Sequence, residues 1–81
     1  MNPELILELY DGLIISPLGV KIISGISKED EDYFPDSVLV IKELNGEDIG
    51  YLKDKKIKAL YCPCLDEEEK KILQEGGTDI L

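Results

Sequence analysis

The central part of the chain holds two apolar segments separated by a polar one, and this pattern constrains the fold more than any other feature. Residues 38–44 and 57–61 carry Val, Ile, Leu and Ala at largely consecutive positions, as is typical of parallel strands covered on both faces. The polar segment 45–56 has the length of a helical crossover, which is right-handed in nearly all proteins. Residues 37–65 therefore predict a β-α-β unit.

The segment before this unit begins with a helix signal. Asn2 can cap a helix, Pro3 suits the first helical position, and the apolar residues that follow share one helical face. Gly12 is well placed just past the helix end, so we expect a helix over residues 3–11. The alternative is a strand that turns at Asp11-Gly12, because this dipeptide is a strong hairpin signal.

The next two apolar runs predict a β-hairpin. Residues 13–16 and 19–25 are rich in Ile and Val, and Pro17 lies in the short turn between them. Ser27 can cap a short helical turn through Tyr33, with Asp30 at the capping-box position. Pro35 then breaks the pattern before the next strand.

The C-terminal segment predicts one more helix. Asp66 can act as its cap, Glu69 occupies the capping-box position, and Gly76 lies past its end. Residues 78–81 are either a frayed tail or a short extra strand. Together, the elements predict one small α/β (α+β-like) domain over residues 1–81, with a mixed four-stranded sheet made of a hairpin and a β-α-β unit, and a C-terminal helix.

The charge balance excludes several functions. Eighteen Asp and Glu against nine Lys give a formal net charge of −9, which disfavours nucleic acid and anionic membranes as partners. The chain has neither His nor Arg, so most catalytic arrangements lack a component and we do not expect an enzyme. Two cysteines do not make a secreted disulfide framework, which favours a cytoplasmic protein.

Cys62-Pro63-Cys64 is the first candidate site. If the segment is extended, both thiols lie on one side and can bind a soft metal such as zinc, with Asp66 as a further ligand. A thiol redox role is a second interpretation, since Cys64 lies near a helix start, although the acidic residues that follow raise a thiol pKa. The third interpretation is that both cysteines are packed as small apolar residues.

The acidic segment 28–36 is the second candidate site. Asp30, Asp32 and Asp36 are carboxylates of the kind that calcium prefers, but Phe34 occupies a position where a calcium loop needs a ligand. The alternative is a solvated turn whose aromatic residues pack under the sheet.

The third candidate site follows from topology. Ligands of parallel sheets bind beyond the carboxyl ends of the strands, which here are residues 45–48 and 62–66. Acidic residues in both segments favour a cation or a basic protein surface there. We therefore expect a non-catalytic accessory or interaction module; a zinc- or calcium-binding protein is the first alternative and a thiol redox protein the second. The sequence leaves the oligomeric state open.

Overall fold

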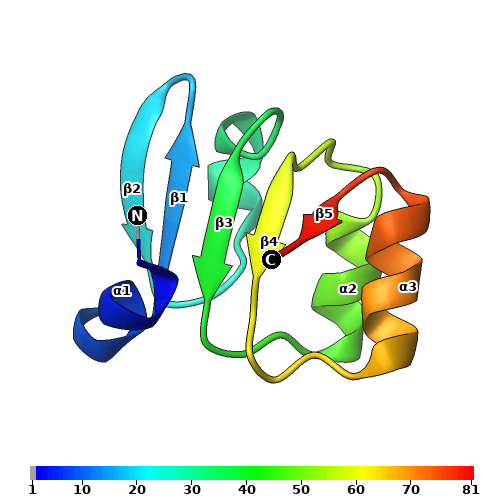
Figure 1. Cartoon of the computed structure of the whole chain (residues 1–81). Helices are drawn as coiled ribbons and strands as arrows, with labels where there is room; N and C mark the ends of the chain where they lie inside the picture. Colours follow the sequence, from blue (N-terminus) through cyan, green and yellow to red (C-terminus); the bar gives the residue numbers. More distant parts are fainter. Residues whose placement is uncertain (1) are drawn as a thin grey trace.

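A mixed five-stranded sheet forms the centre of the computed structural model, which describes residues 2–81 (Figure 1). Its order is β2-β1-β3-β4-β5. β1 is antiparallel to both β2 and β3, whereas β3, β4 and β5 are parallel. The strands are β1 (Gly12–Ser16), β2 (Gly19–Ile23), β3 (Val38–Ile41), β4 (Ala59–Tyr61) and β5 (Asp79–Ile80).

Three α-helices and one 3-10 helix connect and cover the strands. α1 (Pro3–Leu9) precedes the sheet, and the 3-10 helix η1 (Lys28–Tyr33) joins the hairpin to β3. α2 (Gly46–Leu52) is the crossover from β3 to β4, and α3 (Glu67–Glu75) is the crossover from β4 to β5. The order of elements is thus α-β-β-η-β-α-β-α-β.

One face of the sheet, which we call the covered face, holds most of the core. Ile14, Leu39 and Leu60 lie side by side on β1, β3 and β4 and are fully buried. They pack in one cluster with Leu52 of α2 and Leu73 of α3, both also fully buried. α2 and α3 lie next to each other behind the sheet (Figure 1).

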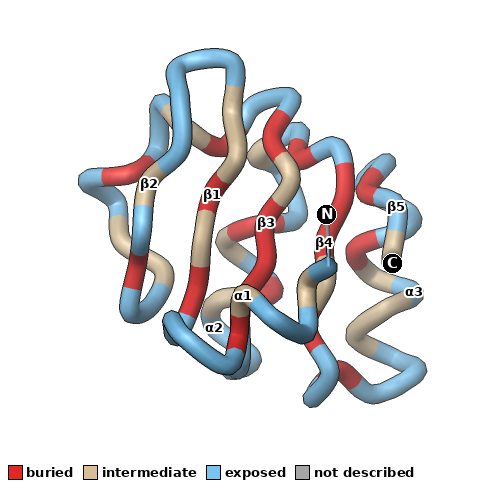
Figure 2. Tube along the Cα trace, turned by 60° about the vertical axis from the view of Figure 1, so that its left-hand side comes forward, coloured by how far each residue is buried: buried red, intermediate tan, exposed pale blue. Residues whose placement is uncertain are grey.

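The opposite face, which we call the open face, is covered only in part. α1 packs on it against β1 and β3, and buries Leu7 (Figure 2). Val40 of β3 lies on this face and is fully buried, whereas Val20 and Ile22 of β2 are more than half exposed. The cover therefore ends before it reaches β2.

The structure confirms the β-α-β unit, the hairpin and the C-terminal helix, and it corrects the strand count. The sheet has five strands rather than four, because residues 79–80 pair with β4 as a short parallel strand. The N-terminal segment is helical, as favoured, but α1 ends at Leu9, where Tyr10 turns to an extended backbone. The alternative with a strand in this segment is wrong.

The structure also settles how the hairpin joins the rest of the sheet. Gly12 of β1 lies opposite Ile41 of β3, so the hairpin extends the parallel strands edge to edge. A side chain at Gly12 would come within 3.0 Å of Ile23 and 3.2 Å of Ile41, so glycine permits the close approach of the three strands.

Candidate functional site

The carboxyl ends of β3 and β4 meet at one edge of the sheet, together with the start of β1. This edge carries a concentration of carboxylates that we call the acidic rim. Its members are all exposed or half-buried and come from the α1–β1, β3–α2 and β4–α3 connections and the first turns of α2 and α3: Asp11, Glu43, Glu47, Asp48, Asp66, Glu67, Glu68 and Glu69.

Helix caps explain why part of the rim is acidic. The side chain of Asn45 accepts a hydrogen bond from the backbone N–H of Asp48 at 2.9 Å, and the Asp48 carboxylate accepts one from the N–H of Asn45 at 3.1 Å. Asp66 and Glu69 form the same reciprocal pair at the start of α3, at 2.8 and 3.1 Å. These carboxylates hold the two helix starts in place.

The remaining rim carboxylates have few neighbouring cations. Lys42 lies 3.7 Å from Asp11, and Lys70 lies 3.5 Å from Glu67. Both pairs are largely exposed, so solvent screens them and they contribute little to stability. The rim therefore keeps a strong excess of negative charge that can act on a partner.

The other end of the parallel strands carries a group of lysines. The α2–β4 connection contains Lys53, Lys55, Lys56 and Lys58 within six residues. Lys55 lies 2.6 Å from Glu31 and 4.5 Å from the centre of the Tyr51 ring. Its hydrogen bond to Glu31 raises the pKa of Lys55 and lowers the pKa of Glu31. Asp36 and Asp54 adjoin the same lysines, so positive and negative charges are mixed at this end.

The two cysteines have different environments. Cys62 is buried in the core cluster, where its Sγ donates to the carbonyl of Lys42 at 3.7 Å, and Cys64 is exposed. Burial raises the pKa of the Cys62 thiol, which disfavours the thiolate that metal binding and redox chemistry need. β4 ends at Tyr61 and the chain turns after Cys62, so the extended geometry expected for the two thiols is not formed.

The three aspartates proposed as calcium ligands in the acidic segment 28–36 also have different environments. Asp30 is buried and forms an ion pair with Lys21 of β2, a hydrogen bond that raises the pKa of Lys21. Asp32 and Asp36 are exposed, and Asp36 has a left-handed backbone with φ 59° and donates its N–H to the carbonyl of Lys56 at 2.9 Å. The Asp30 side chain thus binds Lys21 and does not complete the capping box that the sequence suggested.

The predicted metal ligands are Cys62, Cys64 and Asp66 at the rim and Asp30, Asp32 and Asp36 in the acidic segment. Within residues 2–81, no three Cys, Asp or Glu side chains are placed to hold one metal ion together. Zinc or calcium binding at these residues stays a prediction from the sequence, without a preformed set of ligands in the part of the chain described.

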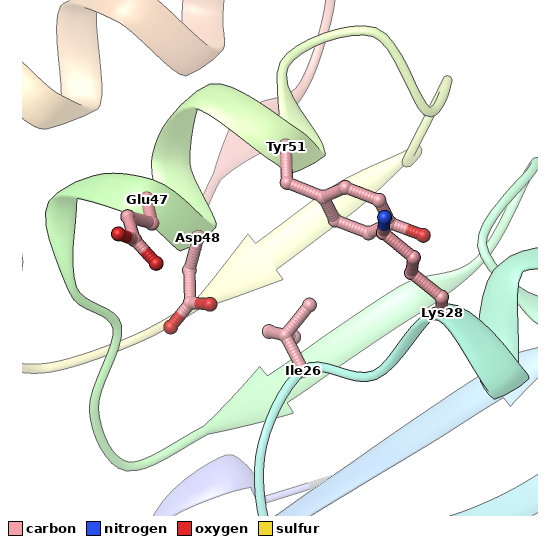
Figure 3. A pocket seen from close by; sticks show the side chains of 5 residues that line it. All are labelled: Ile26, Lys28, Glu47, Asp48 and Tyr51. Carbon is pink, nitrogen blue, oxygen red and sulfur yellow. The ribbon is translucent and has the colours of Figure 1, made fainter.

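Two hollows adjoin the acidic rim, and no pattern in the sequence predicted either of them. The first has a volume of about 280 Å³ and lies between Ile26, Lys28 and the α2 residues Glu47, Asp48 and Tyr51 (Figure 3). The hydroxyl of Tyr51 is buried and has no hydrogen-bond partner among the described residues. More than eighteen positions separate the two sides of this hollow in the sequence, so only the fold brings them together.

The second hollow lies where the start of β1 meets the ends of β2 and β3. It has a volume of about 260 Å³ and is lined by Asp11, Ser24, Ile41, Lys42 and Glu43. Each hollow therefore combines an isoleucine side chain with two carboxylates of the rim.

Comparison with known proteins gives no relative: no protein-family model, no curated protein and no solved structure matches the chain. Within residues 2–81, no helix combines the length and the apolar character needed to cross a membrane.

Proposed function

We propose that the protein is a non-catalytic cytoplasmic interaction module that binds a basic protein surface at its acidic rim. The observation that carries this proposal is the convergence of carboxylates from separate segments, among them Asp11, Glu43, Glu47 and Glu67, at one edge of the sheet. A charge excess of this kind attracts a basic partner over several ångströms and raises the rate of association.

The two hollows suggest how such a partner is held. Lys and Arg combine an apolar stem with a charged head, and they bury the stem against apolar surface while the head stays among polar groups. In the first hollow, Ile26 offers an apolar wall beside Glu47 and Asp48. Each hollow holds two carboxylates against one lysine, so a negative charge remains in each for one long basic side chain of the partner.

Two features support a binding role over catalysis. The chain has no His to transfer protons near neutral pH, and burial raises the pKa of Cys62, so this thiol is a poor nucleophile. The side chains that line the two hollows are mainly carboxylates and lysines. The carboxylates are better suited to recognise charge.

The proposal is tested with a lysine- and arginine-rich peptide of about ten residues, titrated into the protein and followed by NMR and calorimetry. We expect amide shifts at residues 43–48 and 64–69, and a loss of affinity of more than tenfold between about 50 mM and 500 mM salt. The variant Glu43→Gln/Glu47→Gln removes one rim carboxylate from each hollow and should weaken binding about threefold to tenfold.

The matched control is Asp54→Asn/Glu75→Gln, which removes two exposed carboxylates outside the rim and changes the net charge equally. It should change affinity less than twofold. Equal losses in both variants would mean that the peptide responds only to the net charge, and absence of binding at low salt would contradict the proposal. An affinity purification from cell extract at low salt, with salt elution, then identifies the natural partner.

A further inference from the structure

β2 is the outermost strand of the sheet at the hairpin side. Among the described strands, it pairs with β1 alone. Its five residues, Gly19–Ile23, pair with β1 in one uninterrupted antiparallel register. The edge is therefore regular and presents backbone N–H and C=O groups that can pair with another strand.

Of the features that usually prevent edge-to-edge association, the strand at this edge carries only one, a lysine. Natural edge strands carry outward charges, prolines or bulges. Here Val20 and Ile22 face the open side of the sheet with 65% and 58% of their surface exposed. The one charged residue of the strand, Lys21, is held by the buried Asp30 on the covered face.

The distribution of acidic residues indicates which partner fits this edge. Residues 12–28 contain no Asp or Glu, although the chain has eighteen of them, and this is the longest acid-free segment of the sequence. Elsewhere, two copies that each carry a charge of −9 repel one another. A basic partner is drawn to the acidic rim and gains no charge attraction at β2. The hairpin is thus the surface best suited to a second copy of this chain.

We propose that two copies of the protein associate through their β2 strands, antiparallel about a two-fold axis, to form one continuous ten-stranded sheet. A strand that pairs with itself about such an axis presents the same surface on both subunits. This proposal goes beyond the binding of a basic partner and uses a different surface.

One register matches the side chains of both copies. It places Val20 of each copy opposite Ile22 of the other on the open face, which forms two apolar cross-strand pairs. The two Lys21 residues then face each other on the covered face. Each is already neutralised by the Asp30 of its own subunit, so their repulsion is reduced.

The two binding modes respond to salt in opposite directions. Salt screens the repulsion between two copies of charge −9, so added salt strengthens the pairing of β2 strands. The same salt weakens the attraction between the acidic rim and a basic partner.

The test is sedimentation velocity on the full chain from about 10 μM to 1 mM, the range for a modest interface. We expect a monomer–dimer equilibrium that shifts toward dimer in higher salt. The variant Val20→Lys/Ile22→Lys places charge on the edge and should weaken the dimer at least tenfold. The control Leu5→Lys/Leu9→Lys makes the same charge change at two exposed apolar positions of α1 and should leave the dimer within twofold of the wild type.

Hydrogen exchange of the wild-type chain supplies a measurement that does not depend on how the variants fold. Protection of the β2 amides should rise with protein concentration, whereas that of α3 should not. A monomer throughout the concentration range, in low and high salt, would overturn the proposal. A dimer lost in the α1 variant but kept in the β2 variant would also overturn it, and would place the interface on the helix.

Discussion

The two faces of the sheet differ in how completely they are covered. On the covered face, Ile14, Leu39 and Leu60 are fully buried beneath α2 and α3. On the open face, the seven residues of α1 cover β1 and β3 but leave Val20 and Ile22 exposed. The difference indicates that the covered face supplies most of the stability, while the open face and its edge remain available for contacts with other molecules.

The topology explains this asymmetry. β3, β4 and β5 are parallel and follow one another in the sheet, so right-handed crossovers place both connecting helices on the same face. β1 and β2 are joined by a two-residue turn and bring no helix with them. Among the helices of residues 2–81, only the short α1 is left for the open face.

The largest expected effect compares one core residue with one exposed residue. Leu60→Ala removes a fully buried side chain from the covered face and should lower the free energy of unfolding by about 3 kcal/mol. Val20→Ala on the open face should change it by less than about 0.5 kcal/mol. Urea unfolding at a protein concentration that keeps the chain monomeric measures both.

Similar losses of unfolding free energy in the two variants would mean that Val20 is buried in solution. The two faces of the sheet would then be equally well covered. If Leu60→Ala lowered the free energy of unfolding much less than Val20→Ala, the open face would contribute more to stability than the covered face.

The second prediction concerns ion pairs in the two environments. Asp30 is buried on the covered side and binds Lys21, whereas Asp11 is exposed and lies 3.7 Å from Lys42. Asp30→Asn weakens a part-buried charge-assisted hydrogen bond and should lower Tm by about 5 °C. Asp11→Asn should shift Tm by less than about 1 °C, because exposed pairs contribute little.

The pH dependence gives a second measurement of the same pair. Asp30 raises the pKa of Lys21 above its ordinary value of 10.5, so the folded state keeps the Lys21 proton more strongly than the unfolded chain does. The contribution of the pair is complete below that ordinary value and is lost as pH rises through the higher pKa of the folded state. Asp30→Asn should flatten the alkaline part of the stability profile; an unchanged profile would show that Lys21 does not depend on Asp30.

Local signals predicted most of the elements, and tertiary contacts decided the rest. Asn45 and Asp66 form the caps that the sequence indicates, because capping depends on residues three positions apart. Strand β5 has only two residues, and it exists because Asp79 and Ile80 meet β4, which no local pattern reveals. The end of α1 at Leu9 was missed because Gly12 serves the approach of three strands and not a helix end.

The candidate site was also predictable only in part. The carboxyl ends of parallel strands meet at one edge, so the rim around Asp48 and Asp66 followed from the β-α-β unit. The hollows did not follow from it, because Ile26 and Tyr51 are brought together by the path of residues 24–27, which connect β2 to η1. Lys21, the partner of the buried Asp30, was missed because it lies on another element.

The smallest expected effect concerns the two cysteines, which should differ in how fast their thiols react. Cys62 is packed in the core cluster, whereas Cys64 lies outside it and is exposed. A thiol-reactive reagent should label Cys64 rapidly and Cys62 at least tenfold more slowly, until denaturant opens the core. Mass spectrometry after brief labelling identifies the modified residue, and Cys64→Ser provides a chain in which only Cys62 can react.

Burial also raises the pKa of Cys62, so the folded state holds the thiol proton more strongly than the unfolded chain. Stability should therefore decline slightly as pH rises past the ordinary thiol pKa of about 8.5. Cys62→Ala should remove this decline, and Cys64→Ala should keep it. Equal labelling of both thiols in the folded chain would show that the core is open to solvent at the end of β4. The covered face would then be no better protected than the open face where it adjoins the acidic rim.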